Sequence, residues 1–515
     1  METKSYLDFM EEISSQELYK GLLAFGMFTE KLPPVFTTEP YYQYSQTLSS
    51  IEYSKDHDYV QFRSMRNINI PRTFGIPAPM AYRNLCLCLS NHWDKITQHF
   101  HDQTNGDPYR VSRIHIRKEF GSEQIFSMNY KNWRVDGNPD ISLMMNTGRT
   151  MKYSVHADIS TCFPSMYTHS IPWALVGREA AKSNRDEAEW FNDIDAACRH
   201  VKAGETHGLL IGPHASNLVA EIILTTVDRR LRDKKFNFIR NIDDYECYVE
   251  SHERASLFLT TLEFELRQFD LSLNYKKTFI RELPSGVVEN WINQLQSIKI
   301  LTKEKRVSYT DVNLYLDLSL ELAKKFSDSA VLNYAIKELS TCSLTDNAKE
   351  LAVQRIMHMA ALYPYLLPLL DKYVFTPYHA QTDQIKNFSE TLYKESKEIN
   401  NFEGISYSIY FCLKHNFYLS DEIININDRP LFECLPVDDC VAMVLTYLYF
   451  LKANHGKVDS TQIKKIKKIA QQYKDTEADR YWLFWYESLP AKDLEGEWKE
   501  MKNRGISFIR NEFKL

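Results

Sequence analysis

An acidic pair between two apolar segments constrains the fold of this chain more than any other feature. Apolar and aromatic residues flank Asp243 and Asp244 in the segment FIRNIDDYECYV, which predicts two β-strands joined by a tight turn. Upstream, the alternating segment Tyr153–Ile159 predicts another strand, which carries Asp158 near its end. An isolated acidic pair usually belongs to a solvated turn, and Asp158 alone could equally cap a helix or form a salt bridge. In this order and on these elements, the three residues predict carboxylates that meet at one end of a sheet.

Three carboxylates from separate segments suit a pair of magnesium ions. Two-metal phosphoryl transfer requires such a set, because the two ions must clamp the attacking and the leaving oxygen. Mg2+ prefers oxygen ligands in octahedral geometry. We therefore predict that Asp158, Asp243, Asp244 and the backbone of Ile159 hold two Mg2+ ions, with Mn2+ as an alternative. This chemistry predicts a nucleotidyltransferase.

Two further segments lie where such an enzyme would need them. In HGLLIGPHASN, Gly208 and Gly212 allow the backbone to approach a nucleotide or a strand, although a simple loop before the helix at Ser216 is the alternative. In LSLNYKKTF, Lys276 and Lys277 follow the acidic hairpin. Lys277 could neutralise or protonate the leaving pyrophosphate, and the alternative is an exposed basic turn.

The composition narrows the class of protein. The net charge of -6 argues against a tight grip on long duplex nucleic acid, because phosphate contacts supply most non-specific affinity. The nine cysteines are scattered, and the close pair Cys86 and Cys88 lacks a second pair at zinc-site spacing, so we expect neither structural zinc nor disulfides. The apolar run Cys440–Leu451 is too short to span a bilayer. The first residues, METKSYLDFMEE, lack a secretion signal, so we expect a soluble cytoplasmic protein without a membrane partner.

The chain of 515 residues is longer than a single core usually supports, which predicts two or three domains. We expect an N-terminal extension over residues 1–60, a mixed α+β region over residues 61–288 and an α-helical region over residues 289–515. The middle region has the predicted order strand, helix, long insertion, helix, hairpin, helix, strand. Helical periodicity is clearest in these segments: Met80–Phe100, Ser216–Arg232, Glu253–Phe269, Asp311–Lys325, Ser329–Leu339 and Asn347–Ala361.

The order of these motifs resembles the palm of reverse transcriptases. Asp158 matches the first aspartate motif, Gly212 the glycine motif, the Asp243–Asp244 pair the double-aspartate turn, and Lys277 the lysine motif that follows. The resemblance covers roughly residues 60–285. It implies a reverse-transcriptase-like fingers and palm of α+β class.

A narrower resemblance is to the abortive-infection reverse transcriptases of bacteria, the AbiK-like polymerases. The string MYTHSIPWA at Met166–Ala174 is its most specific part, and the run from His207 through Ala220 and Glu221 extends it. The C-terminal half matches only as a long helical domain. The resemblance therefore implies that an all-α, solenoid or HEAT-like domain follows the palm.

The resemblance also implies nucleotide-binding residues. Phe163 lies five positions after Asp158, where reverse transcriptases place the aromatic ring under the sugar of the incoming nucleotide, so we expect deoxynucleoside triphosphates as substrates. A core phenylalanine is the alternative. Ile211 and Gly212 are further candidates for this contact. In the expected fingers, Arg113 and Lys118 are candidates for holding the triphosphate, on a weak match.

Two departures from the family pattern bear on how synthesis would start. Asn241 replaces the aromatic residue that usually precedes the double aspartate, and neither a primer-gripping motif nor a thumb follows Lys277. AbiK-like polymerases are understood to extend DNA from a tyrosine of the protein itself without a template. The resemblance thus implies an anti-phage DNA polymerase, a homo-oligomer, with single-stranded DNA attached to the protein. Among 31 tyrosines the sequence does not identify the primer, and one candidate cluster is Tyr41, Tyr42 and Tyr44.

Two other functions stay open at this point. The chain could be a reverse transcriptase that copies a dedicated RNA. It could also be a toxin or binding module with an inert palm, in which the helical half acts. The basic run Lys464–Lys468 could touch nucleic acid in that case, although a solvated helix face is the plainer interpretation.

Overall fold

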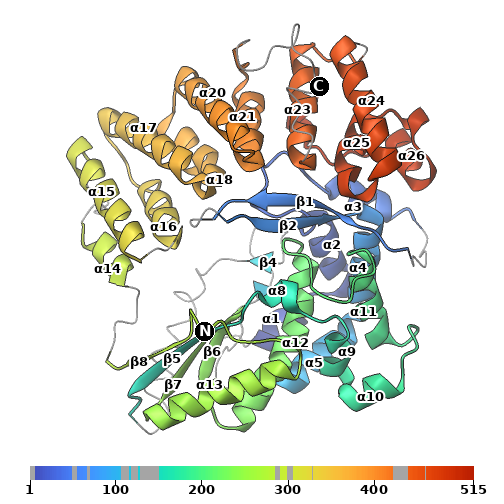
Figure 1. The fold of residues 1–515 in the computed structure, drawn as a ribbon, viewed down its shortest axis with the longest axis vertical. Helices are drawn as coiled ribbons and strands as arrows, with labels where there is room; N and C mark the ends of the chain where they lie inside the picture. The colour runs from blue at the N-terminus through green and yellow to red at the C-terminus, as the bar shows by residue number, and fades with distance from the viewer. Residues whose placement is uncertain are drawn as a thin grey trace. The chain divides into compact units, whose positions relative to one another are not determined.

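The computed structural model divides the chain into two compact units, each of which is described by itself (Figure 1). The first unit comprises Met1–Thr29, Thr38–Tyr59 and Gly75–Val287, and the second comprises Glu30–Thr37, Val60–Phe74 and Val288–Leu515. The fold is mostly helical with small sheets. The structure describes residues 6–48, 55–66, 70–105, 115–116, 126–127, 150–284, 290–298, 306–326, 329–420, 439–458 and 460–514.

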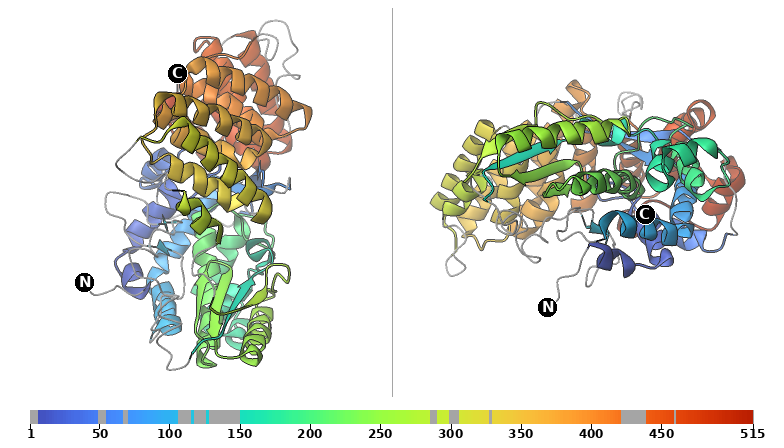
Figure 2. Two further views of the ribbon diagram at one scale, coloured as in Figure 1. Left: turned by 90° about the vertical axis from the view of Figure 1, so that its left-hand side faces the viewer. Right: turned by 90° about the horizontal axis from the view of Figure 1, so that it is seen from below.

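The first unit contains a four-stranded antiparallel sheet. Its strands β5 (Tyr153–Asp158), β6 (Phe238–Asn241), β7 (Asp244–Val249) and β8 (Phe279–Glu282) lie in the order β6-β7-β5-β8. The predicted strand and hairpin are therefore confirmed. Helix α13 (His252–Arg267) packs along β5 and β7, and Figures 1 and 2 show it beside these strands.

The long helix α12 (His214–Asp233) packs on α13 and joins the sheet to the rest of the first unit. Most of its side chains are buried, which agrees with the helical periodicity of its sequence. The other helices of this unit are α1 (Tyr6–Glu11), α2 (Ser15–Phe25), α3 (Glu39–Ser45), α4 (Pro79–Asn91), α5 (Trp93–Thr104), α8 (Cys162–Ser165), α9 (Ser170–Val176), α10 (Arg178–Ser183) and α11 (Trp190–His200).

The single helix expected over Met80–Phe100 is wrong, because α4 ends at Asn91 and α5 begins at Trp93. Between them, His92 has φ -100° and ψ 13°, outside the helical region. Its ring nitrogen Nε2 lies 2.8 Å from a carboxylate oxygen of Asp193 on α11. The break therefore coincides with a contact to a distant helix, and the helical periodicity of the sequence does not reveal such a contact.

The second unit consists mainly of helices that pack on their neighbours along the chain. Pairs in contact include α15 with α16, α20 with α21, α21 with α23, and α24 with α25 (Figures 1 and 2). Its helices are α14 (Asn290–Ser297), α15 (Tyr309–Phe326), α16 (Ser329–Leu339), α17 (Asp346–Leu362), α18 (Leu367–Leu370), α19 (Thr376–Tyr378), α20 (Thr382–Glu398), α21 (Phe402–His415), α23 (Cys440–Ala453), α24 (Thr461–Thr476), α25 (Trp482–Ser488) and α26 (Gly496–Asn503).

Two short N-terminal segments take part in the second unit. Phe36 forms an antiparallel bridge with Ile509. In the two-stranded sheet of β1 (Tyr59–Ser64) and β2 (Arg72–Pro77), the end of β1 contacts α21, where the Ser64 hydroxyl and the Met65 amide donate to the Glu403 carboxylate. Long-range pairs of this kind follow from packing rather than from local sequence.

The apolar run from Cys440 is buried along α23. Among the described residues, no helix combines the length and the hydropathy that crossing a bilayer would require.

A short pair of strands, β3 (His115–Ile116) and β4 (Phe126–Ser127), completes the described elements of the first unit.

Candidate active site

Three acidic residues meet at one end of the four-stranded sheet. The antiparallel register of β5 and β7 sets Asp158 directly opposite Asp244. The amide of Ile159 donates to the carbonyl of Asp243 at 3.0 Å, which joins the end of β5 to the hairpin turn. Segments that are far apart in the sequence therefore bring their carboxylates to one edge of the fold.

The turn that carries the acidic pair has an unusual backbone. Strand β6 ends at Asn241 and β7 begins at Asp244, so Ile242 and Asp243 form a two-residue connection. Ile242 has φ 57°, in the left-handed region that β-branched residues rarely adopt. Such a conformation costs on the order of 1–3 kcal/mol and persists only where surrounding contacts hold it.

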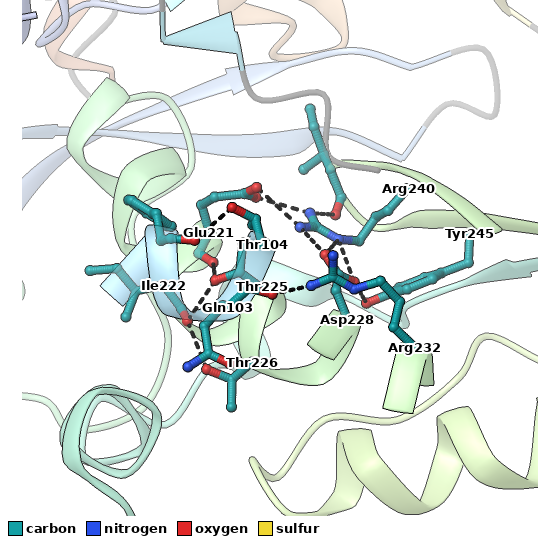
Figure 3. A network of polar contacts seen from close by, with 12 residues as sticks. Gln103, Thr104, Glu221, Ile222, Thr225, Thr226, Asp228, Arg232, Arg240 and Tyr245 are labelled. Atoms are coloured by element: carbon teal, nitrogen blue, oxygen red, sulfur yellow. Dashed lines mark hydrogen bonds and ion pairs between the residues drawn. The ribbon is translucent and has the colours of Figure 1, made fainter. Parts of the chain in front are cut away.

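A buried arginine supplies those contacts (Figure 3). The Arg240 side chain is fully buried, and one of its terminal nitrogens donates to the Ile242 carbonyl at 2.9 Å. The same guanidinium donates to Glu221 at 2.9 and 3.1 Å. It also donates to Asp228 at distances from 2.7 to 3.1 Å. On β7, the Tyr245 hydroxyl donates to Asp228 at 3.1 Å, so both strands of the hairpin are bonded to α12.

The charged groups in this network are bonded to one another, with one guanidinium between two carboxylates. Although burial opposes it, the neighbouring Asp228 and Glu221 carboxylates raise the pKa of Arg240. Burial raises the pKa of Asp228, against the lowering effect of Arg240. A charged arginine with two carboxylates and a tyrosine hydroxyl forms a closed set of hydrogen bonds. We infer that this network fixes the position of the acidic turn.

Strand alternation separates this network from the acidic residues. Asn241, Asp244 and Asp158 lie side by side in register. One position along, Arg240 lies beside Tyr245. Successive side chains in a strand point to opposite faces. The arginine network therefore lies on one face of the sheet and the acidic cluster on the other.

The acidic cluster holds more negative than positive charge. Asp158 accepts hydrogen bonds from the Asn274 amide nitrogen at 2.9 Å and from the Lys277 ammonium at 2.8 Å. The Asp244 side chain is exposed, but partial desolvation, with the nearby Asp243 and Asp158 charges, raises its pKa to about 7. The hydrogen bond to Asp158 raises the pKa of Lys277. Within the described part of the chain, Lys277 is the cation that lowers the pKa of Asp244.

This donor set fits a hard divalent cation. All the carboxylate ligands are oxygens, which Mg2+ prefers. Desolvation, and then the neighbouring carboxylates, raise the pKa of Asp244, so the described residues around it do not fully compensate its negative charge. A divalent cation bound here would supply the missing compensation. The chemistry of the residues is therefore compatible with the predicted magnesium site.

The structure describes some of the other predicted residues and not others. Phe163 is half-buried in α8, and its carbonyl accepts a hydrogen bond from the Leu209 amide at 2.8 Å. Ile211 is half-buried, and its carbonyl accepts from the Gly75 amide at 2.9 Å. Gly212 has φ 123°, a conformation that side chains disfavour. Arg113 and Lys118 lie outside the described residues.

Gly208 has a role in packing. A Cβ atom at this position would lie 2.7 Å from the Pro164 carbonyl oxygen. Its amide donates to the Met166 carbonyl at 2.7 Å. The glycine therefore allows its loop to approach the segment around α8, which is a contact within the protein.

The tyrosine cluster of α3 is largely enclosed. Tyr41 and Tyr44 are buried, and Tyr42 is half-buried with its ring 5.8 Å from that of Tyr19. A more exposed tyrosine lies beside the acidic cluster: Tyr275 is 71% exposed and follows Asn274, which contacts Asp158. The sequence did not single out this residue, and its hydroxyl donates to Glu263 at 3.3 Å.

Sequence reasoning missed the residues that support the acids. Asn274 donates to the Asp158 carboxylate through its side chain and to the Asp158 carbonyl through its amide, at 2.9 and 2.7 Å. Its position three residues before Lys277 was the signal in the sequence that could have identified Asn274. Arg240 lies three positions before Asp243, but its partner Asp228 becomes identifiable only through packing.

Comparisons with known proteins give little further guidance. No protein family model and no curated protein sequence matches this chain. Among solved structures it is similar to apo telomerase from Candida tropicalis, with 10% identity and a TM-score of 0.34, over 87% of this chain and 72% of that one.

Two further telomerase structures from the same organism show a similar likeness. For the apo enzyme truncated from its C-terminal domain, identity is 11% and the TM-score 0.31, over 48% of this chain and 54% of that one. For telomerase in complex with a TWJ fragment of telomeric RNA, identity is 11% and the TM-score 0.29, over 83% and 66%. The chain thus spans only about half of the truncated telomerase. Likeness at this level assigns no activity.

Proposed function

We propose that this protein is a DNA polymerase of reverse-transcriptase type, a nucleotidyltransferase that adds deoxynucleotides by two-metal phosphoryl transfer. The observation that carries the proposal is the register that sets Asp158 opposite Asp244, with Lys277 bonded to Asp158. Carboxylates from a strand end and a hairpin turn are the ligand set that this chemistry needs.

In this proposal each residue has a defined role. Asp158, Asp243, Asp244 and the backbone of Ile159 would hold two Mg2+ ions, or Mn2+ in their place. When bound, the ions supply Lewis-acid activation of the attacking hydroxyl and neutralise charge on the triphosphate. Lys277 keeps a positive charge and a transferable proton beside the cluster, suited to the departing pyrophosphate.

Substrate contacts complete the proposal. Phe163, Ile211 and Gly212 contact the sugar and base of a deoxynucleoside triphosphate, and Arg113 and Lys118 contact its phosphates. The support for these roles is the resemblance of the motifs to reverse transcriptases.

The biological role proposed is anti-phage abortive infection. The resemblance to AbiK-like polymerases supports DNA synthesis primed by a tyrosine hydroxyl, without a template and in a homo-oligomer. The product would then be single-stranded DNA covalently attached to the protein. The absence of a primer-gripping motif after Lys277 in the sequence agrees with this mode of priming.

The test is incubation of purified protein with deoxynucleoside triphosphates and Mg2+, followed by mass spectrometry of the intact protein. We expect mass to increase in DNase-sensitive steps. The double variant Asp243→Asn, Asp244→Asn should lower the rate about a thousandfold or more, because it removes several kcal/mol of transition-state stabilisation. The matched control is Glu246→Gln, an acid two positions along β7 that is paired with His156 and should retain activity.

Other outcomes would support other functions. A product complementary to a co-purifying RNA would indicate a templated reverse transcriptase. Full phage protection by the double variant would indicate a toxin or binding module and would overturn the proposal. Protein that gains no mass, with or without added RNA, would do the same.

A further inference from the structure

A cysteine, a histidine and an aspartate converge in the first unit, among helices α4, α5 and α11. The Cys88 sulfur lies 3.3 Å from the Asp193 carboxylate, and the His92 Nε2 lies 2.8 Å from the same oxygen. The three ligand atoms all lie within 4.8 Å of one another. This separation is small enough for a single ion to contact all three.

Local structure explains why these side chains meet. Cys88 and His92 are four positions apart, so they lie on the same side of the helix end. The His92 amide donates to the Cys88 carbonyl at 3.1 Å, which maintains that spacing although α4 stops at Asn91. Asp193 lies in the first turn of α11, which packs against α4. Two helices thus supply the three groups.

The donor types select a class of ion. A thiol, an imidazole and a carboxylate are the ligands found in zinc sites, whereas Mg2+ prefers oxygen ligands alone. Three protein ligands leave a fourth position of the tetrahedron for water. The His92 and Asp193 side chains are 20% and 45% exposed, while Cys88 is buried. Ions and water can therefore reach the cluster from its outer side.

The hydrogen bonds among Cys88, His92 and Asp193 are also compatible with a zinc site. Cys88 and His92 both direct a polar atom at one oxygen of Asp193. A bound divalent ion would replace the thiol proton, which passes to solvent, and would leave the imidazole neutral with its proton on Nδ1.

We propose that Cys88, His92 and Asp193 bind a Zn2+ ion that ties α11 to the junction of α4 and α5. The cysteine spacing in the sequence gave no sign of this site, because its other ligands are a histidine and an aspartate. The proposal is independent of the acidic cluster on the sheet.

The experiment measures metal content and Co2+ binding of the full chain. Protein purified without chelators should contain one zinc per chain. After metal removal, added Co2+ should give the visible absorption of a tetrahedral ion and a near-ultraviolet thiolate charge-transfer band, and Zn2+ should abolish both. Asp193→Asn should weaken Co2+ binding at least about 10–100-fold, and Cys88→Ser should remove the charge-transfer band.

Two controls separate this site from others. Cys86→Ser changes a buried thiol on the same helix outside the cluster, and it should leave the cobalt spectrum unchanged. The double variant Asp243→Asn, Asp244→Asn should also keep the spectrum, whatever its polymerase activity. A wild-type protein without a tetrahedral cobalt spectrum, or a charge-transfer band that survives in Cys88→Ser, would overturn the proposal. If Cys88→Ser does not fold, Asp193→Asn still tests the proposal, because the Asp193 side chain is partly exposed.

Discussion

At its acidic end, the sheet carries a different cluster of charged residues on each face. On the buried face, Arg240 donates to Glu221 and Asp228, and every charge has a bonded partner. On the other face, Asp158 and the Asp243–Asp244 pair share Lys277. On β7 the two clusters adjoin, because Asp244 of the acidic cluster is followed by Tyr245 of the arginine network.

The difference indicates a division of labour. A compensated buried network resists any change of partner, because breaking it leaves an uncompensated charge in a low dielectric. A cluster with excess negative charge gains from an added cation. The first is therefore suited to hold the turn, and the second to bind a ligand.

The largest expected effect is on stability, from Arg240→Met. The substitution leaves Glu221 and Asp228 buried without their cation, so we expect a loss of about 3–5 kcal/mol in the free energy of unfolding. Denaturant unfolding of the purified variant measures it. The control is Arg267→Met, which removes an exposed guanidinium paired with Glu263 and should cost far less stability. Equal losses in the two variants would break the distinction between the faces.

A buried carboxylate in the second unit provides a third case. Glu403 is buried and accepts hydrogen bonds from the neutral groups of Ser64 and Met65, and burial raises its pKa to about 7. The folded chain therefore keeps a proton that the unfolded chain loses above its usual pKa of 4.5. Stability from this group is present at low pH and is lost as the pH rises from about 4.5 to about 7.

The size of that loss is on the order of 2–3 kcal/mol for the second unit. Glu403→Gln should reduce the slope of stability against pH in this range. Unfolding curves between pH 4.5 and pH 8 measure the slope. The same slope in the variant and the wild-type protein would show that Glu403 is as well compensated as the carboxylates around Arg240.

Addition of Mg2+ tests the uncompensated face directly. At a hundred times the dissociation constant, a cation bound only by the folded protein raises stability by about 2.7 kcal/mol. We expect this increase in the wild-type protein and not in the double variant Asp243→Asn, Asp244→Asn. Thermal unfolding with and without Mg2+ measures it. An equal increase in both proteins would place the cation elsewhere.

The smallest effect is expected from Asp244→Asn without divalent cations. The fold disfavours the charge of Asp244, but the side chain is exposed and water screens that charge. The neutral amide should therefore leave stability unchanged or raise it by about 0.5 kcal/mol or less. Thermal unfolding at pH 8 with a chelator is the measurement. A clear loss of stability would show that Asp244 has a structural role like that of Asp228.

Local pattern predicted much of the secondary structure. Helices α12, α13, α15, α16 and α17 begin and end close to the predicted residues, because amphipathic spacing reflects which side chains become buried. The hairpin around Asp243 and Asp244 is also confirmed. The break at His92 was missed, since the contact that accompanies it comes from a different helix.

What the sequence alone determined is therefore local: the strands of the four-stranded sheet, five of the helices, and the positions of Asp158, Asp243 and Asp244 at strand ends or in the turn. Only the tertiary structure decided which side chains share a cluster. The register of β5 on β7 brings Asp158 to Asp244, and the packing of α12 brings Glu221 and Asp228 to Arg240. The physical reason is that hydrophobic spacing is set by neighbours along the chain, whereas the partners of a buried charge are set by strand pairing and helix packing between distant segments.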